Sequence, residues 1–368
     1  MAEGGSAPAS WVPEKAKLHM AMMVFQLGYG GNHVIMKIAL NMGVSKLVFP
    51  FYRNIIALLA LAPSAYFLEK ESRPKLTLYF LIQFFVLGLI GITLNQGFYI
   101  FGLYYTSPTL ASATENSVPA LTFIMATLLG MEQVHLTRKD GIAKVVGTIV
   151  SVAGALVITL YKGPTIYSSN QTSNESLLLS FGDAEGKYWT IGCICLIAHA
   201  LCWSCWIVLQ VPLLKKYPAR FSFVSYSCFF AVIQFGAIAA WIDRDSQAWK
   251  ISSASEVLII LYSGLVASAM VFAIQVYVVD RGGPLFFSMY LPLQTLIAAL
   301  MATFILGEEF YLGGIIGGVL LIAGLYLVVL GKNEESKYVS DKATTMPSSP
   351  ESPGEESSII QPLLHDSV

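Results

Sequence analysis

Long apolar runs alternate with short polar segments along almost the whole chain. Ten runs are long enough to cross a bilayer, which requires about 20 predominantly apolar residues in a helix. They cover residues 18–41, 46–68, 76–103, 107–130, 140–161, 188–213, 219–241, 256–279, 285–306 and 312–331. The pattern therefore predicts an all-α membrane protein of about ten transmembrane helices.

Lysines and arginines are unevenly distributed between the two sides of this predicted bundle. If the N-terminus is cytosolic, fifteen of the 22 fall in cytosolic segments, five fall on the opposite side, and Lys37 and Arg53 lie inside helices. Cytosolic loops of membrane proteins carry an excess of these residues. We therefore expect both termini in the cytosol, which requires an even number of helices.

The polar segments complete the predicted topology. Residues 1–17 are a cytosolic N-terminus without the pattern of a cleavable signal peptide. Residues 162–187 form a non-cytosolic loop with candidate glycosylation sites at Asn170 and Asn174. Residues 332–368 are rich in Ser, Pro and Glu, so we expect a disordered cytosolic tail.

Composition supports a membrane protein and argues against several other classes. The chain is 55% hydrophobic and 12% charged, whereas soluble domains carry roughly 25% charged residues. The net charge of −1 argues against a nucleic-acid partner. The five cysteines lie inside apolar runs, unlike a disulfide framework. No nucleotide-binding, serine-hydrolase or zinc-protease motif occurs, so we expect neither an enzyme nor a cofactor.

The two halves of the chain resemble each other. Matching residues lie 176 positions apart over 49 residues without a gap, and a second match follows at an offset of 170. The matches include Gly88-Leu89 with Gly264-Leu265, Pro108 with Pro284, Met125-Ala126-Thr127 with Met301-Ala302-Thr303, Glu132 with Glu308, and Gly147 and Gly154 with Gly317 and Gly324. The offset carries each helix onto the fifth helix after it, so the second half is inverted. Inverted repeats are typical of secondary transporters, which bind solute between the halves.

Several longer strings connect the chain with a known family. They include Ala39-Leu40-Asn41-Met42-Gly43, Asn95-Gln96-Gly97-Phe98-Tyr99, Asn116-Ser117-Val118-Pro119-Ala120, Arg244-Asp245-Ser246-Gln247-Ala248-Trp249 and Gly307-Glu308-Glu309-Phe310-Tyr311. On these strings the chain resembles the plant nodulin-21-like EamA transporters of the drug/metabolite transporter superfamily, also called UMAMIT proteins, and most of all their Walls Are Thin branch. The resemblance covers residues 12–332 and resumes at 362–365.

The resemblance implies a fold and a substrate class. It implies two five-helix EamA repeats, here residues 18–161 and 188–331, and transport of amino acids and related organic acids. For this branch it implies auxin, an indole carboxylate, at the vacuolar membrane. The chain departs from the branch pattern at Glu115, where a glutamine is expected.

Ionisable and amide groups inside the predicted helices are candidates for the transport site, because such groups are costly in a membrane. Arg53 or Lys37 would attract a solute carboxylate, and Asn95, Gln96 and Asn116 would hydrogen-bond it. The alternatives are a helix-locking pair between Arg53 and Glu115, and a Lys37 side chain that reaches the interface. Since an apolar environment favours a protonated carboxyl group, Glu115 is also the candidate for proton coupling.

Further candidates lie near helix-bending prolines or among aromatic residues. Pro119 and Pro292 each remove a backbone hydrogen bond, so Tyr290 and Gln294 are expected near the solute. An indole ring would stack on Trp203, and Gln275 is another buried amide; packing between helices is the alternative for both. His199 shares a face with Cys195 and Cys202, but no further ligand supports a metal site.

The tail carries a candidate sorting signal. Its acidic and dileucine-like residues are Glu355, Ile359, Ile360, Leu363 and Leu364. With the resemblance, this signal favours the vacuolar membrane, and the plasma membrane is the alternative. The sequence as a whole predicts a secondary carrier of a small organic acid, with auxin first and amino acids second. A non-transporting receptor of the same fold and a homodimer both remain open.

Overall fold

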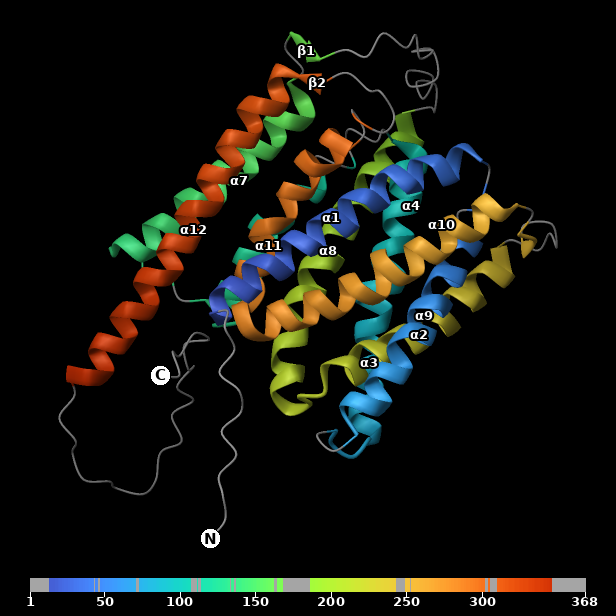
Figure 1. Ribbon diagram of the computed structural model, residues 1–368, viewed down its shortest axis with the longest axis horizontal. Helices are drawn as coiled ribbons and strands as arrows, with labels where there is room; N and C mark the ends of the chain where they lie inside the picture. Colours follow the sequence, from blue (N-terminus) through green and yellow to red (C-terminus); the bar gives the residue numbers. More distant parts are fainter. Residues whose placement is uncertain are drawn as a thin grey trace.

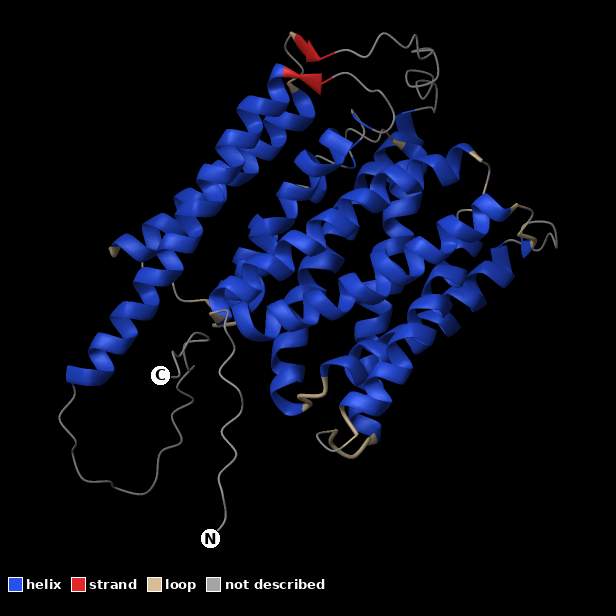
Figure 2. Cartoon of the chain, in the orientation of Figure 1, coloured by secondary structure: helices blue, strands red, loops and turns tan. Residues whose placement is uncertain are grey.

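The computed structural model describes residues 13–42, 44–45, 47–70, 73–106, 111, 114–132, 134–135, 137–161, 164–167, 186–242, 249–251, 253–301, 304 and 310–345. Within these ranges, seven helical stretches are long and apolar enough to cross a membrane. One of them, Ala254–Ile297, contains the predicted span 256–279 and the first part of the predicted span 285–306. The described part of the chain is thus an all-helical membrane protein apart from two short strands (Figures 1 and 2).

The elements follow the predicted apolar runs in order. The first half contains α1 (Glu14–Asn41), α2 (Val48–Leu68), α3 (Leu78–Gly88), the π-helix η1 (Leu89–Leu94), α4 (Asn95–Tyr105), α6 (Val118–Leu128), α7 (Lys139–Leu160) and β1 (Thr165–Tyr167). The second half contains α8 (Gly186–Lys216), α9 (Arg220–Ile242), α10 (Ala254–Gly264), the π-helix η4 (Leu265–Met270), α11 (Val271–Met301), β2 (Phe310–Tyr311) and α12 (Leu312–Thr345). Each predicted run contains a described helix, although α6 spans only 11 residues.

The internal repeat is visible in the element boundaries. The series α3, η1, α4 and the series α10, η4, α11 begin and change helix type at positions 176 residues apart. Even the N-caps correspond, since Thr77 accepts a hydrogen bond from the backbone N–H of Phe80 and Ser253 from that of Glu256. Each half therefore places a π-helix at the same point of one spanning segment.

The long element α11 bends where two predicted spans meet. Gly283 has φ 86° and ψ 165°, which is not helical. This region of backbone space is readily available only to glycine. Pro284 follows and removes a further backbone donor. The Gly283 bend separates the predicted spans 256–279 and 285–306.

Helices α7 and α12 pack against each other along their length and form one edge of the molecule in Figure 1. Glycines allow this close approach. A Cβ atom on Gly147 would lie 2.7 Å from the Gly324 carbonyl oxygen, and one on Gly154 would lie 2.7 Å from that of Gly317. These are the glycines that match in the repeat, so equivalent helices of the two halves meet through equivalent residues.

Two features differ from the sequence expectation. Helix α12 continues to Thr345, although the polar tail was expected to begin at residue 332. An ion pair connects this extension with α7, because Glu335 bonds Lys144. In addition, β1 lies in the predicted polar loop and pairs antiparallel with β2. This pairing connects the end of α7 with the start of α12.

Candidate functional site

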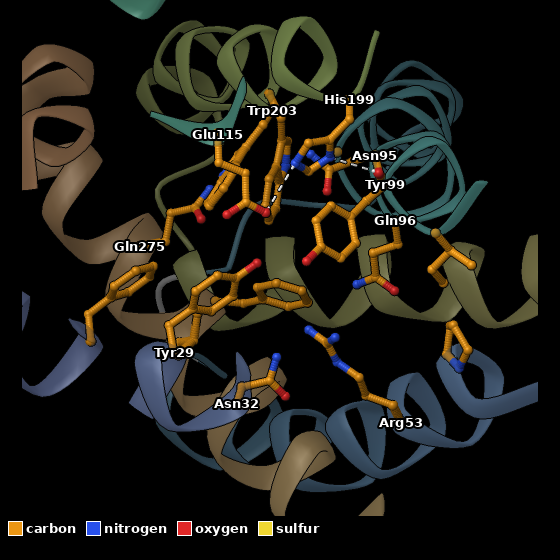
Figure 3. A pocket seen from close by; sticks show the side chains of 17 residues that line it. Tyr29, Asn32, Arg53, Asn95, Gln96, Tyr99, Glu115, His199, Trp203 and Gln275 are labelled. Carbon is orange, nitrogen blue, oxygen red and sulfur yellow. Dashed lines mark hydrogen bonds and ion pairs between the residues drawn. The ribbon is translucent and has the colours of Figure 1, made fainter. Parts of the chain in front are cut away.

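A small cavity lies between the two halves of the chain. Residues from α1, α2, α4, α8 and α11 line it, together with Glu115, which precedes α6 (Figure 3). Its free volume is about 50 Å³, enough for a few water molecules. Pockets that hold a small organic molecule usually measure about 300–1,000 Å³. The cavity must therefore widen before it can accept such a molecule.

Arg53 provides a positive charge on one wall of the cavity. The side chain is 6% exposed. Its Nε donates to Ser268 Oγ at 2.5 Å and its Nη2 donates to the Ala267 carbonyl at 3.1 Å. Both acceptors belong to η4 in the second half. The hydroxyl and the carbonyl of this π-helix together orient the guanidinium.

Glu115 lies on the opposite wall, beside His199. The distance between Glu115 Oε1 and His199 Nε2 is 3.6 Å, and Glu115 Oε2 accepts from Gln294 at 3.3 Å. His199 Nδ1 lies 2.9 Å from the Asn95 carbonyl oxygen. Since a carbonyl can only accept, Nδ1 carries the hydrogen and Nε2 faces the carboxyl group. The pair can thus hold one proton on either residue.

Several buried polar atoms of the cavity wall have no hydrogen-bond partner among the described residues. They are Asn95 Nδ2, Gln96 Oε1, His199 Nε2, Trp206 Nε1 and Gln275 Nε2. An unsatisfied polar group is costly in an apolar environment. The side-chain nitrogens of Asn95, Trp206 and Gln275 are always hydrogen-bond donors. Together with Arg53 they suit a ligand that carries acceptor oxygens.

Aromatic side chains form the rest of the wall. Tyr29 and Trp203 have ring centroids 5.7 Å apart, and Trp206 meets Phe272 edge-to-face at 5.4 Å. Trp206 also packs on Gly91 of η1, where any Cβ would collide with the indole ring. The cavity consequently has an apolar side suited to a flat ring and a polar side suited to a carboxylate.

Equivalent positions of the two halves line the cavity. On α1 and α8, Phe25, Tyr29 and Asn32 correspond to His199, Trp203 and Trp206 at an offset of 174. On α4 and α11, Asn95, Gln96 and Tyr99 correspond to Val271, Phe272 and Gln275 at an offset of 176. The cavity therefore lies on the pseudo-symmetry axis that relates the repeats.

Most of the residues singled out from the sequence meet at this cavity. Arg53, Asn95, Gln96, Glu115, Trp203 and Gln275 line it. The others do not line it: Gln294 bonds Glu115, Asn116 accepts from Thr295 at 3.0 Å, and Tyr290 hydrogen-bonds His19 near the start of α1. In the described residues no cluster of potential metal ligands occurs.

Other candidates fall outside what the structure describes. The side chain of Lys37 is outside the described residues, as are Asn170, Asn174 and the sorting-signal residues 355, 359, 360, 363 and 364. Arg53 and Glu115 do not form the helix-locking pair considered above, because Arg53 bonds η4 and Glu115 bonds His199 and Gln294. In Figure 3 the rings of Tyr29 and Tyr99 lie between Arg53 and Glu115.

The sequence reasoning missed Tyr29, Asn32, Tyr99 and the position of His199. Tyrosine and histidine within apolar runs are usually packing residues, so they did not stand out. The identical spacing of residues 25, 29, 32 and residues 199, 203, 206 was the available signal.

Comparison with known proteins identifies the family. The model of the EamA-like transporter family matches twice, at residues 17–160 and 190–330. A WAT1-related protein of Arabidopsis thaliana is 68% identical over 339 residues, which cover 92% of each chain. Protein WALLS ARE THIN 1 of Arabidopsis thaliana is 57% identical over 97% of this chain and 96% of its own. An auxin-induced protein of Pinus taeda is 49% identical over 97% of this chain and 93% of its own.

A solved crystal structure supports the fold. It has a TM-score of 0.64, is 14% identical, and covers 85% of this chain and 98% of its own. At that identity the likeness concerns the fold alone. The family, by contrast, follows from the two family-model matches and from the plant relatives, and it is a family of transporters rather than enzymes. The chain belongs to the EamA-like transporter family, in its WAT1-related (Walls Are Thin 1) branch.

Proposed function

We propose that this multi-pass membrane protein is a secondary transporter of a small organic acid and that the cavity between the repeats is its solute site. The observation that carries the proposal is the combination in one cavity of Arg53 with unpartnered donors on Asn95, Trp206 and Gln275. Secondary transporters with inverted repeats bind solute at this position. No covalent chemistry is required of the site.

Auxin (indole-3-acetic acid) is the first candidate substrate. Its carboxylate suits Arg53, and its ring suits the aromatic wall at Tyr29 and Trp203, where offset or tilted ring contacts are favourable. One relative supports this choice by its name, since the Pinus taeda protein that is 49% identical is called auxin-induced. An amino acid is the alternative, because Glu115 offers a negative group for an ammonium.

Transport would proceed by alternating access. We propose ten spanning helices in two inverted repeats, residues 18–161 and 188–331, joined by a non-cytosolic loop at 162–187. The N-terminus (1–17) and the tail (332–368) would be cytosolic. The cavity's free volume of about 50 Å³ corresponds to a closed state, so rocking of the repeats would open it to each side in turn.

We propose that Glu115 couples transport to a proton. Its carboxyl group faces His199 Nε2 across 3.6 Å, and the two residues belong to different repeats. Protonating Glu115 would remove its negative charge, weaken its contact with His199 and let the repeats separate. Three titratable groups lie around the pair, Tyr29, Arg53 and Tyr99, and the neutral amide of Gln294 hydrogen-bonds Glu115.

The vacuolar membrane is our proposed location, in keeping with the resemblance and with the sorting-signal residues of the tail. We further propose that Asn170 and Asn174 are glycosylated and that the protein forms a homodimer. The small-molecule solute, the lipid bilayer and the proton are the partners that the site and the family support.

Uptake of labelled indole-3-acetic acid into proteoliposomes, with and without an imposed pH gradient, tests the proposal. We expect saturable uptake that excess unlabelled auxin abolishes. Glu115→Gln should keep uptake but remove its dependence on the pH gradient, and Lys337→Gln, far along α12, should match the wild type. Uptake of amino acids alone would replace auxin by the alternative, and binding without flux would favour a receptor.

A further inference from the structure

A second cavity lies between α2, α3 and α9, away from the solute site. Its free volume is about 320 Å³. Its walls are mainly apolar, with Leu58 and Ala62 from α2, Leu81 from α3 and Phe229 from α9. Tyr66 and Phe229, which also line it, are 53% and 46% exposed. The cavity therefore opens onto the outer face of the helix bundle, where a membrane protein meets lipid chains.

One basic residue lines this cavity, and two more lie near the C-terminal ends of α2 and α8. Arg73, in the turn between α2 and α3, lines it and is exposed. In the described part of the chain, its guanidinium has no ion pair or side-chain hydrogen bond. Lys70 lies over the Tyr66 ring at 6.0 Å, and Lys216 lies over the Tyr79 ring at 5.6 Å. Such pairs of tyrosine and lysine are typical of the membrane–water interface.

Glu69, one turn before Arg73, has its carboxylate engaged elsewhere. Glu69 is 8% exposed, and its two oxygens accept the backbone N–H groups of Phe221 and Ser222 at 2.8 and 2.7 Å. Those N–H groups begin α9, where a negative charge is stabilised by the helix dipole. Glu69 thus serves the fold, and Arg73 remains available to an anion.

A buried hydroxyl group also lines the cavity. Ser225 is 7% exposed, lines the cavity, and its Oγ has no hydrogen-bond partner among the described residues. A buried hydroxyl without a partner costs free energy. A ligand with an acceptor just beyond its anionic group would satisfy it. The ester carbonyl of a phospholipid lies at that position, between the phosphate and the acyl chains.

We propose that this cavity is a binding site for an anionic phospholipid. The phosphate group binds Arg73, an ester carbonyl accepts from Ser225, and an acyl chain fills the apolar space between α2 and α9. In the topology proposed above, this end of the bundle faces the cytosol, where anionic lipids attract basic residues. The site is separate from the solute cavity, since the two share no lining residue.

Native mass spectrometry of the purified full-length protein tests the proposal. The probes are phosphatidylglycerol, phosphatidylcholine and inorganic phosphate. We expect the wild type to retain phosphatidylglycerol in preference to phosphatidylcholine and to release little of it to inorganic phosphate. Arg73→Gln should reduce this preference about tenfold or more, because a hydrogen-bonded charge is lost, whereas Arg73→Lys should keep most of it.

Two further variants separate a specific site from general lipid coating. Ala62→Phe adds bulk at an exposed position that lines the cavity, so it should reduce retention of phosphatidylglycerol without disturbing the core. Lys337→Gln removes a basic charge that is 70% exposed on α12 and should change nothing. Equal retention by Arg73→Gln and the wild type would overturn the proposal. So would equal retention of both lipids, or displacement of the lipid by inorganic phosphate, which would indicate a phosphate site instead.

Discussion

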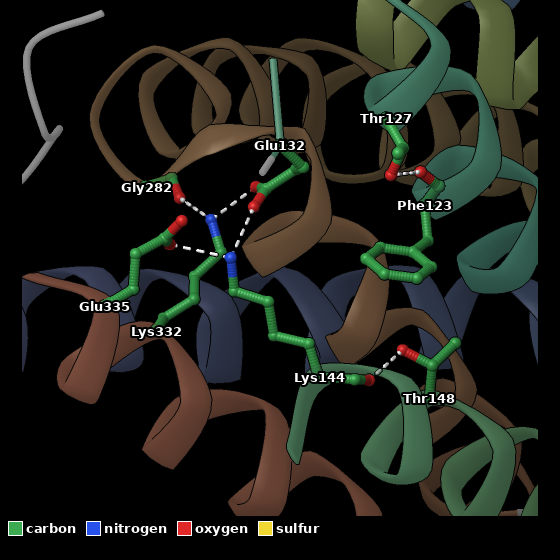
Figure 4. A network of polar contacts seen from close by, with 8 residues as sticks. All are labelled: Phe123, Thr127, Glu132, Lys144, Thr148, Gly282, Lys332 and Glu335. Atoms are coloured by element: carbon green, nitrogen blue, oxygen red, sulfur yellow. Dashed lines mark hydrogen bonds and ion pairs between the residues drawn. The ribbon is translucent and has the colours of Figure 1, made fainter. Parts of the chain in front are cut away.

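Glu132, in the loop between α6 and α7, binds one lysine of α7 and one of α12 (Figure 4). Removing its charge should destabilise the protein strongly. Glu132 Oε1 lies 2.6 Å from Lys332 Nζ, and Oε2 lies 3.2 Å from Lys144 Nζ. The Glu132, Lys144 and Lys332 side chains are 4%, 0% and 14% exposed. Lys144 also bonds Glu335 at 2.7 Å, so two lysines and two glutamates balance one another.

The expected cost follows from this burial. Removing one partner of a buried ion pair costs about 3–5 kcal/mol, because the other charge stays buried. Glu132→Gln leaves Lys144 with Glu335 and Lys332 with the Gly282 carbonyl, 3.4 Å away. The matched control is Glu334→Gln. This variant breaks the ion pair between Glu334 and Lys337, whose side chains are 55% and 70% exposed, respectively. Exposed ion pairs contribute up to about 1 kcal/mol.

Acid should remove the same contribution from the wild type. Burial raises the pKa of Glu132, but Lys332 and Lys144 outweigh it, so the pKa lies below the ordinary 4.5. A lowered folded-state pKa gives stability that is present above the unfolded-state pKa and is lost as the pH falls through the folded-state value. Glu132→Gln should lack this loss.

Denaturant titration in mixed micelles, at neutral pH and between pH 5 and pH 3, measures both effects. The reasoning is refuted if Glu132→Gln unfolds at the same denaturant concentration as Glu334→Gln at neutral pH. It is also refuted if the two variants lose stability in parallel on acidification.

Three further predictions concern the solute site, the helix contacts and the caps. Arg53→Gln should raise the KM for indole-3-acetic acid uptake about tenfold or more through loss of a charged hydrogen bond, but should leave binding of an uncharged indole unchanged by intrinsic fluorescence. Gly154→Ala should cost about 1–3 kcal/mol of unfolding free energy in the same micelle titration, because the added Cβ would meet the α12 backbone. Gly97→Ala is the control, since a Cβ on Gly97 meets nothing within 4 Å. Ser253→Ala should cost about 0.5–2 kcal/mol by loss of the cap on the Glu256 N–H, measured in that titration against Ser253→Thr.

The spans could be predicted from sequence because lipid requires long apolar helices. The two π-helices could not. Leu89–Leu94 and Leu265–Met270 are apolar like their neighbours, and a π-turn shifts the helical periodicity by a single residue. Polar side chains from other helices are what bond the two segments. Arg53 reaches η4, and Gln234 of α9 accepts from Thr93 of η1 at 2.6 Å. Contacts of this kind depend on the tertiary fold, so the sequence pattern does not reveal them.

The site was predicted in part, and the division has a physical reason. Arg53 and Glu115 stood out because a charge in a membrane helix needs an explanation. Their partners did not, because the sequence gives depth along a helix but not rotation about it. Asn95 and Asn116 lie at similar predicted depths, yet Asn95 lines the cavity and Asn116 bonds Thr295. Only packed helices fix which face each amide presents.

The repeats also explain why a symmetric scaffold can hold an asymmetric solute. Asn95 and Gln96 of the first half occupy the positions that Val271 and Phe272 occupy in the second. In the same way, His199 corresponds to Phe25, and Trp206 to Asn32. Equivalent backbone positions therefore carry a different side-chain chemistry in each repeat: an amide opposite an apolar or aromatic group, or an imidazole opposite a phenyl ring. A solute with one charged end and one aromatic end needs such a difference, whereas a symmetric lining would offer the same chemistry to both ends. Exchanging residues 95 and 96 with 271 and 272 should preserve the fold and abolish selective binding of the carboxylate.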